Sequence, residues 1–135
     1  MLNKKIILWC LVIVTTHAVS TQAVAQNYQT RLNGKRLVMA GTSCAGIEFA
    51  KDGTTAKWHN ELECTVNDKL SSNWRVKWLD ADNFLMIQTE RNSEKSPPSV
   101  SAYQVLSVTG KKVVLKDIWT GWGNLKDNIE SYSIK

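Results

Sequence analysis

The residue types that could support acid–base catalysis are few in this chain. His59 is one of two histidines, and the other, His17, lies in a predicted export signal. Glu61 and Glu63 are two residues apart, which would place both carboxylates on one face of a strand. No serine has the glycine pattern of a nucleophile elbow. We therefore interpret His59 as a polar residue at a strand end and predict no catalytic residue; a hydrolase using His59 with an acid such as Glu61 is the least favoured function.

Metal and cofactor chemistry also lacks its usual donors. Transition-metal sites prefer nitrogen and sulfur ligands, and beyond the signal the chain has one histidine and two cysteines. Asp80, Asp82 and Asn83 resemble calcium ligands, but the glycine and distal glutamate of an EF-hand are missing, and a turn accounts for them. No phosphate loop or dinucleotide fingerprint is present. We expect no metal and no cofactor.

Tryptophan is the most informative residue type, with six in the whole chain and five outside the signal. Trp is both a bulky core residue and a frequent anchor of binding sites. Trp74 and Trp78 alternate with Arg75 and Lys77, which favours core positions for the two indoles. In a carrier of a small apolar ligand, the cavity would instead be lined by some of the candidate cavity residues Trp58, Trp74, Trp78 and Trp119.

Trp122 differs from the other tryptophans because Gly121 and Gly123 bracket it in a segment with no alternating pattern. It either stands at a rim for docking or caps a barrel end, with the glycines permitting the turns. The candidate binding site comprises Trp122, Gly121, Gly123, Asn124 and Lys126.

The amino terminus has the three parts of a cleavable export signal over residues 1–25. Lys4 and Lys5 precede an apolar run, and Ala23 and Ala25 form a small-x-small cleavage site. The apolar run is much shorter than the roughly 20 residues of a membrane-spanning helix, so we expect no stable membrane anchor. Cleavage leaves one domain, residues 26–135, and lowers the net charge from +5 to +3. This excludes the dense basic surface of a nucleic-acid-binding protein and predicts a periplasmic or secreted protein.

Cys44 and Cys64 are the two cysteines that remain after cleavage. An even count in an oxidising compartment predicts a disulfide, and the pair lacks the Cys-x-x-Cys spacing of a reactive dithiol. A turn at Asp52 and Gly53 would place Cys44 opposite Glu61 in a hairpin. The predicted bond therefore closes the hairpin's open end, about three residues beyond the direct partner.

The elements that must position these residues are short strands. No segment shows sustained helical periodicity, and residues 26–34 are expected to form a loose lead-in. Alternating segments separated by turn residues predict about eight strands, near residues 36–40, 45–50, 54–59, 73–79, 84–89, 100–108, 113–119 and 129–134. Successive hairpins of this length predict an all-β antiparallel meander, closed as a small barrel or a flattened sandwich.

Leu32-Asn33-Gly34-Lys35-Arg36 at the first strand resembles the opening of lipocalins, whose pattern is Gly-x-Trp, although Arg36 stands in place of the tryptophan. The mature chain as a whole resembles the small meander barrels of bacterial envelopes, including lipocalin-like domains and periplasmic lysozyme-inhibitor proteins. The resemblance implies architecture and compartment.

The function expected from these observations is that of an exported, non-enzymatic binding protein. The leading interpretation is a module that binds a protein partner in the cell envelope, of inhibitor or immunity type. The alternative is a lipocalin-like carrier of a small apolar ligand.

Overall fold

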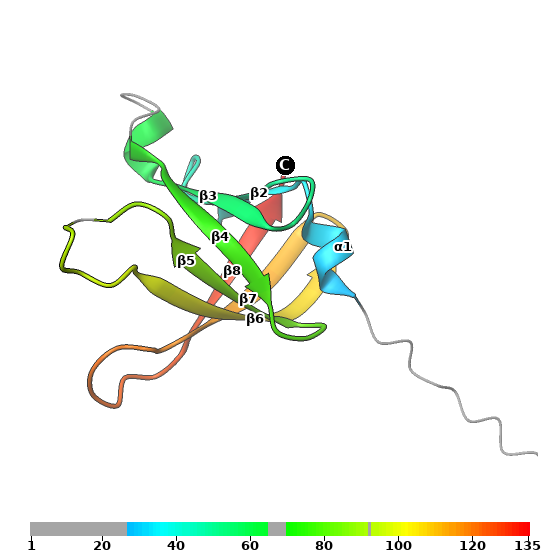
Figure 1. The fold of residues 1–135 in the computed structure, drawn as a ribbon. Coiled ribbons are helices and arrows are strands. Elements are labelled where there is room, and N and C mark those ends of the chain that lie inside the picture. Colours follow the sequence, from blue (N-terminus) through cyan, green and yellow to red (C-terminus); the bar gives the residue numbers. More distant parts are fainter. Residues whose placement is uncertain (1–26, 65–69, 92) are drawn as a thin grey trace, which may run out of the picture.

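The computed structural model describes residues 27–64, 70–91 and 93–135. In these residues eight antiparallel strands form a closed barrel in which each strand pairs with the next and the last pairs with the first (Figure 1). This confirms the predicted meander barrel. The strands are β1 (Arg36–Met39), β2 (Gly46–Phe49), β3 (Thr55–His59), β4 (Ser72–Trp78), β5 (Asn83–Gln88), β6 (Val100–Thr109), β7 (Lys112–Ile118) and β8 (Asn128–Ile134).

The export signal predicted over residues 1–25 lies outside the described residues. Among those that are described, no helix has the length and apolar character needed to cross a membrane.

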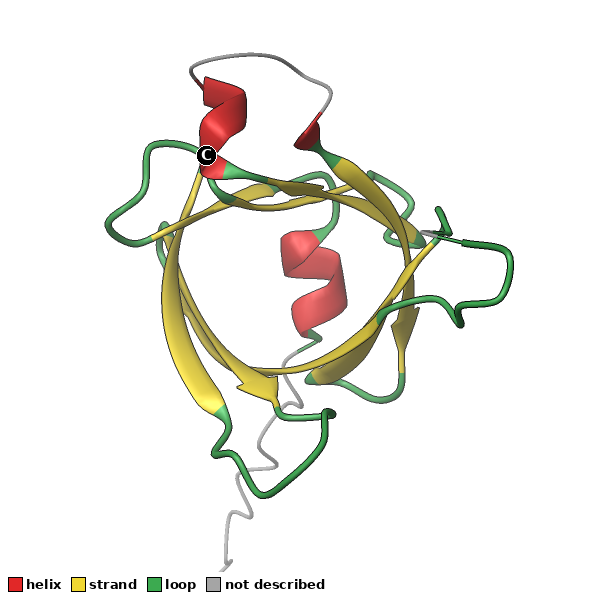
Figure 2. Ribbon diagram, turned by 90° about the vertical axis from the view of Figure 1, so that its left-hand side faces the viewer, coloured by secondary structure: helices red, strands yellow, loops and turns green. Residues whose placement is uncertain are grey.

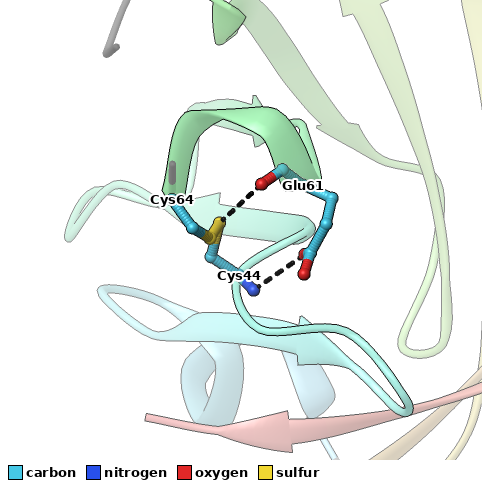
Figure 3. A group of neighbouring side chains, drawn as sticks. All are labelled: Cys44, Glu61 and Cys64. Carbon is cyan, nitrogen blue, oxygen red and sulfur yellow. Dashed lines mark hydrogen bonds between the residues drawn. A yellow bond between two sulfur atoms is a disulfide. The ribbon is translucent and has the colours of Figure 1, made fainter. Parts of the chain in front are cut away.

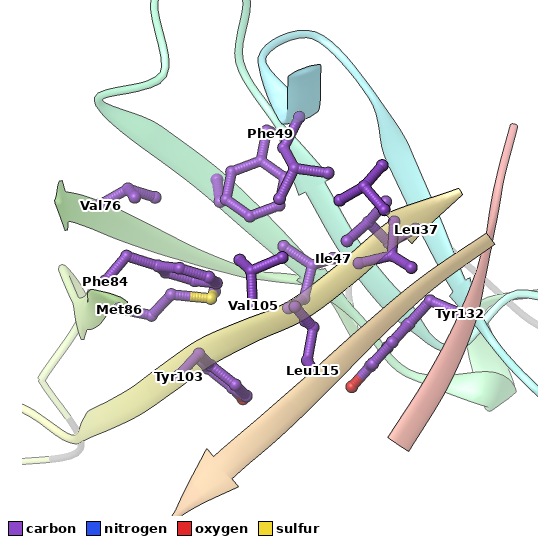
Figure 4. Close-up of a cluster of buried hydrophobic side chains, with 14 residues drawn as sticks. Leu37, Ile47, Phe49, Val76, Phe84, Met86, Tyr103, Val105, Leu115 and Tyr132 are labelled. Carbon is purple, nitrogen blue, oxygen red and sulfur yellow. The ribbon is translucent and has the colours of Figure 1, made fainter. Parts of the chain in front are cut away.

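The barrel interior is filled by alternate residues of each strand. In β4 the predicted alternation holds, because Val76 is buried while Arg75 and Lys77 are exposed. Phe84 of β5 is fully buried and is part of the core cluster drawn in Figure 4. Its ring meets the ring of Phe49 edge-on at 5.6 Å and stacks on that of Tyr103 at 5.2 Å, both measured between ring centroids. Offset and edge-on contacts of this kind are the favoured geometries of aromatic pairs.

One end of the barrel is closed by helix α1 (Tyr28–Leu32), which Figure 2 shows behind the ring of strands. The expectation of a loose lead-in over residues 26–34 is wrong for this segment. The Asn27 side chain caps the helix by accepting the Thr30 amide N–H, and Leu32 is fully buried in the core. Five residues are too few for a periodic pattern, which is why the sequence does not show the helix.

The first hairpin has the predicted register. Gly46 of β2 pairs with His59 of β3, so Cys44 lies opposite Glu61. The turn contains Gly53 at φ 68°, a conformation that glycine adopts without steric cost. After β3 the chain forms a short 3-10 helix, η1 (Glu61–Cys64). The expectation that Glu61 and Glu63 share a strand face is therefore wrong.

Candidate functional site

The segment from Trp119 to Asp127, here called the Trp122 loop, connects β7 to β8 and projects from the barrel end opposite α1 (Figure 1, orange). Asp127 joins the two ends of the loop, since its Oδ1 accepts the Trp119 amide N–H at 3.0 Å. A Cβ on Gly121 would lie 2.4 Å from the Trp119 ring, so the indole packs directly on this glycine backbone. Gly123 has φ 81°, which favours glycine.

Trp122 is 98% exposed at the tip of this loop. The glycines on either side of Trp122 allowed two interpretations, an indole displayed at the rim or an indole that caps the barrel end. The exposure of the side chain supports the first. Asn124 and Lys126 are exposed beside it. The loop and the start of β8 also expose the apolar side chains of Trp119, Leu125 and Ile129. A cluster of exposed apolar side chains on a loop is typical of an interaction site.

The barrel end opposite α1, here called the mouth, contains a cavity of about 260 Å³. Two of the four predicted cavity tryptophans, Trp58 and Trp74, line it. The other two do not: Trp78 packs on Phe84 in the core, with 4.8 Å between ring centroids, and Trp119 lies on the Trp122 loop. The complete lining consists of Trp58, Trp74, Met86, Ser101, Tyr103 and Asp117.

Two carboxylates face the mouth from neighbouring strands. Asp117 of β7 pairs with the buried Tyr103, and Glu130 of β8 pairs with the buried Leu115. Because directly paired residues point to the same face of a sheet, both acids are on the inner side of the barrel. Neither acid was predicted as a site residue from the sequence. The alternation of Val113, Leu115 and Asp117 along β7 does indicate that Asp117 points inward.

The ionisable groups of the mouth influence one another. Burial raises the pKa of Tyr103 to about 12, and the Asp117 carboxylate adds to the shift. Burial also raises the pKa of Tyr132, with further contributions from Tyr103, Glu130 and Asp117. The pKa of Asp117 itself is raised by partial burial and then by the negative charge of Asp127. In Figure 4 the Tyr103 and Tyr132 rings lie on either side of Leu115, with their hydroxyl oxygens at the lower edge of the core. Additional negative charge is therefore disfavoured in this region.

His59 lies on the outer surface between two carboxylates. Its Nε2 is 2.8 Å from an oxygen of Glu48, and its Nδ1 is 2.5 Å from an oxygen of Glu63. Both ring nitrogens are thus within hydrogen-bond distance of a carboxylate oxygen, and the ring bridges Glu48 and Glu63. With both nitrogens engaged, neither is free to take a proton from a substrate. A polar hollow of about 250 Å³ adjoins this group, lined also by Arg36, Cys44 and Cys64.

Cys44 and Cys64 form the predicted disulfide, which joins the β1–β2 loop to η1 (Figure 3). Glu61 lies beside the bond rather than beside His59. Its carboxylate accepts the backbone N–H groups of Ser43, Cys44 and Ala45 at 2.7–3.0 Å. These bonds, that of Cys44 foremost, lower the pKa of Glu61 to about 2. Although the two sulfurs and the carboxylate lie close together, cysteines joined in a disulfide offer no thiolate to a metal.

The Asp80 turn behaves as its sequence predicts. Asp80 Oδ1 accepts the backbone N–H groups of Asp82 and Asn83, and the Asn83 side-chain amide also donates to Asp80. These bonds, that of Asp82 first, lower the pKa of Asp80 to about 2. Turn formation thus uses the oxygens that gave this segment its calcium-like appearance.

No family model, curated protein or solved structure matches this chain.

Proposed function

We propose that this protein is a non-catalytic binding protein, exported to the periplasm or secreted, that recognises a protein partner through the Trp122 loop. The observation that carries the proposal is the 98% exposure of Trp122 on a loop closed by the Trp119–Asp127 hydrogen bond. A disulfide-bonded barrel with an apolar loop at one rim supports the same role, because rigid scaffolds commonly position binding loops.

The exposed indole can supply enough energy to anchor a complex. Burying roughly 200 Å² of aromatic surface at about 25 cal/mol per Å² corresponds to about 5 kcal/mol before ordering costs. Those costs are lowered here because the loop is already held by the Trp119 packing on Gly121 and by Asp127. Preorganised loops lose less conformational freedom on binding.

The proposal is tested by comparing Trp122→Ala with Leu79→Ala. Leu79 is 55% exposed in the β4–β5 turn at the α1 end of the barrel, so its substitution removes an accessible apolar side chain away from the loop. Immobilised mature proteins would be incubated with envelope extract and the captured proteins quantified by mass spectrometry.

We expect one partner to be captured equally by the wild type and by Leu79→Ala. Loss of a hot-spot tryptophan costs about 2 kcal/mol or more, so Trp122→Ala should weaken its binding by about 30-fold. Addition of the purified partner should also shift the tryptophan emission of the wild type to shorter wavelength. Capture of the same protein in the same amount by Trp122→Ala would show that the loop is not the binding site.

A further inference from the structure

The mouth cavity combines aromatic walls with uncompensated negative charge. Trp58, Trp74 and Tyr103 form its apolar wall, and Asp117 provides a carboxylate on the same lining. Glu130 lies one strand away on the inner face of the barrel. The residues that line the cavity lie outside the Trp122 loop, so a ligand in the cavity and a partner at Trp122 would contact different residues.

No basic side chain neutralises these acids in the part of the chain that the structure describes. Among the described residues, both ion pairs involve His59, which lies on the outer surface of the barrel. Glu130 accepts a hydrogen bond from the Asn128 amide at 2.8 Å, which leaves its charge in place. Asp127 adds a further negative charge close to Asp117. The cavity is therefore acidic without a resident counter-charge.

The chemistry of the lining discriminates among ligands. An apolar ligand would remove water from the Asp117 carboxylate without replacing its interactions, which is costly. An anion would be repelled by Asp117, Glu130 and Asp127. A cation, in contrast, is attracted both by carboxylates and by the faces of aromatic rings.

We propose that the mouth cavity binds an organic ammonium group, seated against Trp58, Trp74 and Tyr103 and paired with Asp117. The volume of about 260 Å³ is slightly below that of typical small-molecule sites, which span roughly 300–1,000 Å³. It fits a group of few heavy atoms such as a trimethylammonium or an alkylammonium. The group belongs either to a free amine or to a lysine-type side chain of another protein. Tryptophans alone would favour an apolar ligand, whereas the carboxylate of Asp117 in the same lining favours a cationic one.

The charge requirement is tested with the wild-type mature protein and two probes of the same shape. Choline carries a trimethylammonium group, and 3,3-dimethylbutan-1-ol is its neutral isostere. Each would be titrated while the indole N–H resonances are followed by NMR. We expect saturable shifts of the Trp58 and Trp74 resonances with choline, at least about tenfold tighter than with the alcohol, because charged pairing adds to apolar contact. Equal affinities for the two probes would overturn the proposal.

The role of Asp117 is tested by Asp117→Asn, with Glu94→Gln as the matched control. Glu94 is an exposed acid of the β5–β6 loop and is not part of the cavity lining. The control therefore removes one negative charge from a position outside the cavity. Asp117→Asn should lower choline affinity about tenfold, because it removes the coulombic attraction between the carboxylate and the trimethylammonium group, and Glu94→Gln should leave it within about twofold. Equal effects of the two substitutions would refute a specific contact with Asp117. If Asp117→Asn does not fold, the choline–alcohol comparison decides by itself.

A third titration distinguishes the two sources of the ammonium group. A short peptide containing trimethyllysine would be compared with the same peptide containing norleucine. Binding of choline supports a free amine as ligand, whereas binding of the trimethyllysine peptide alone supports a side chain of a protein. The absence of indole shifts with both choline and the trimethyllysine peptide would overturn the proposal.

Discussion

Replacing Leu32 with alanine tests whether α1 is the closure of the barrel end rather than an accessory segment. Leu32 is fully buried and is the only buried residue of its five-residue helix. A Leu→Ala change at such a site loses the transfer free energy of the removed carbons and leaves a cavity, which together cost about 3 kcal/mol. Since small domains are stable by about 5–15 kcal/mol, this is a large part of the total.

The helix itself should detach before the barrel unfolds. Five residues cannot form a stable helix in isolation, so α1 depends on Leu32 and on contacts such as the Tyr28 amide donating to the Ala81 carbonyl at 3.4 Å. Arg31 immediately precedes Leu32 and is a trypsin site whose accessibility reports release of the helix. Urea denaturation measures the stability, and limited trypsinolysis measures the detachment.

The control for this experiment is Leu79→Ala, which should change stability by less than about 0.5 kcal/mol because the side chain is exposed. Two results together would refute this role of α1: a stability of Leu32→Ala in urea within about 1 kcal/mol of the wild type, and cleavage at Arg31 no faster than in the wild type.

Two further predictions concern the loop end of the barrel. The Cys44–Cys64 bond spans a sequence separation of 20, so the double substitution to alanine, or reduction of the wild type, should lower the free energy of unfolding in urea by about 3 kcal/mol. A reductant should not change the stability of the double variant. An unchanged urea midpoint after reduction of the wild type would contradict the prediction. Glu61 has a pKa of about 2 against an ordinary 4.5, so its stabilising effect is complete above pH 4.5 and is lost as the pH falls through about 2. Melting temperatures measured from pH 6 to pH 2 should therefore fall less steeply for Glu61→Gln than for the wild type, and parallel curves would argue against the role assigned to this carboxylate.

The strands could be predicted because their local patterns agree with their environment. β4 alternates Trp74, Val76 and Trp78 with Arg75 and Lys77, and one face of a barrel strand is buried while the other meets water. The first hairpin register also followed from local information, since Asp52-Gly53 fixes the turn and the turn fixes every pair as far as Gly46 and His59.

Partners of polar side chains could not be predicted in the same way. Glu61 and Glu63 differ in role because η1 directs one carboxylate to the amides of residues 43–45 and the other to His59. A strand was the natural expectation for two acids at this spacing. In the 3-10 helix the two carboxylates no longer share a face as they would on a strand. The helix ends at Cys64, which forms the disulfide.

The mouth could be predicted only in part. Trp58 and Trp74 line a cavity, as the carrier alternative expected, whereas the alternation along β4 had favoured a core position for Trp74. Asp117 comes from β7, and its place beside Trp58 of β3 and Trp74 of β4 depends on the closure of the sheet into a barrel by the β1–β8 pairing. Alternation indicates that such residues face inward, but only the closed sheet shows which aromatic rings they meet.

Closure of the sheet also has a consequence for the order in which the protein can fold. Every pairing from β1 to β8 along the meander joins neighbours in the chain, whereas β1 finds its second partner only in β8, the last of these eight strands in chain order. Until β8 is in place, β1 and β7 both present open edges, and such edges invite pairing with other chains. The seven residues of β8 thus protect the whole barrel from aggregation, and a chain truncated before Asn128 would carry all the other strands with none of that protection.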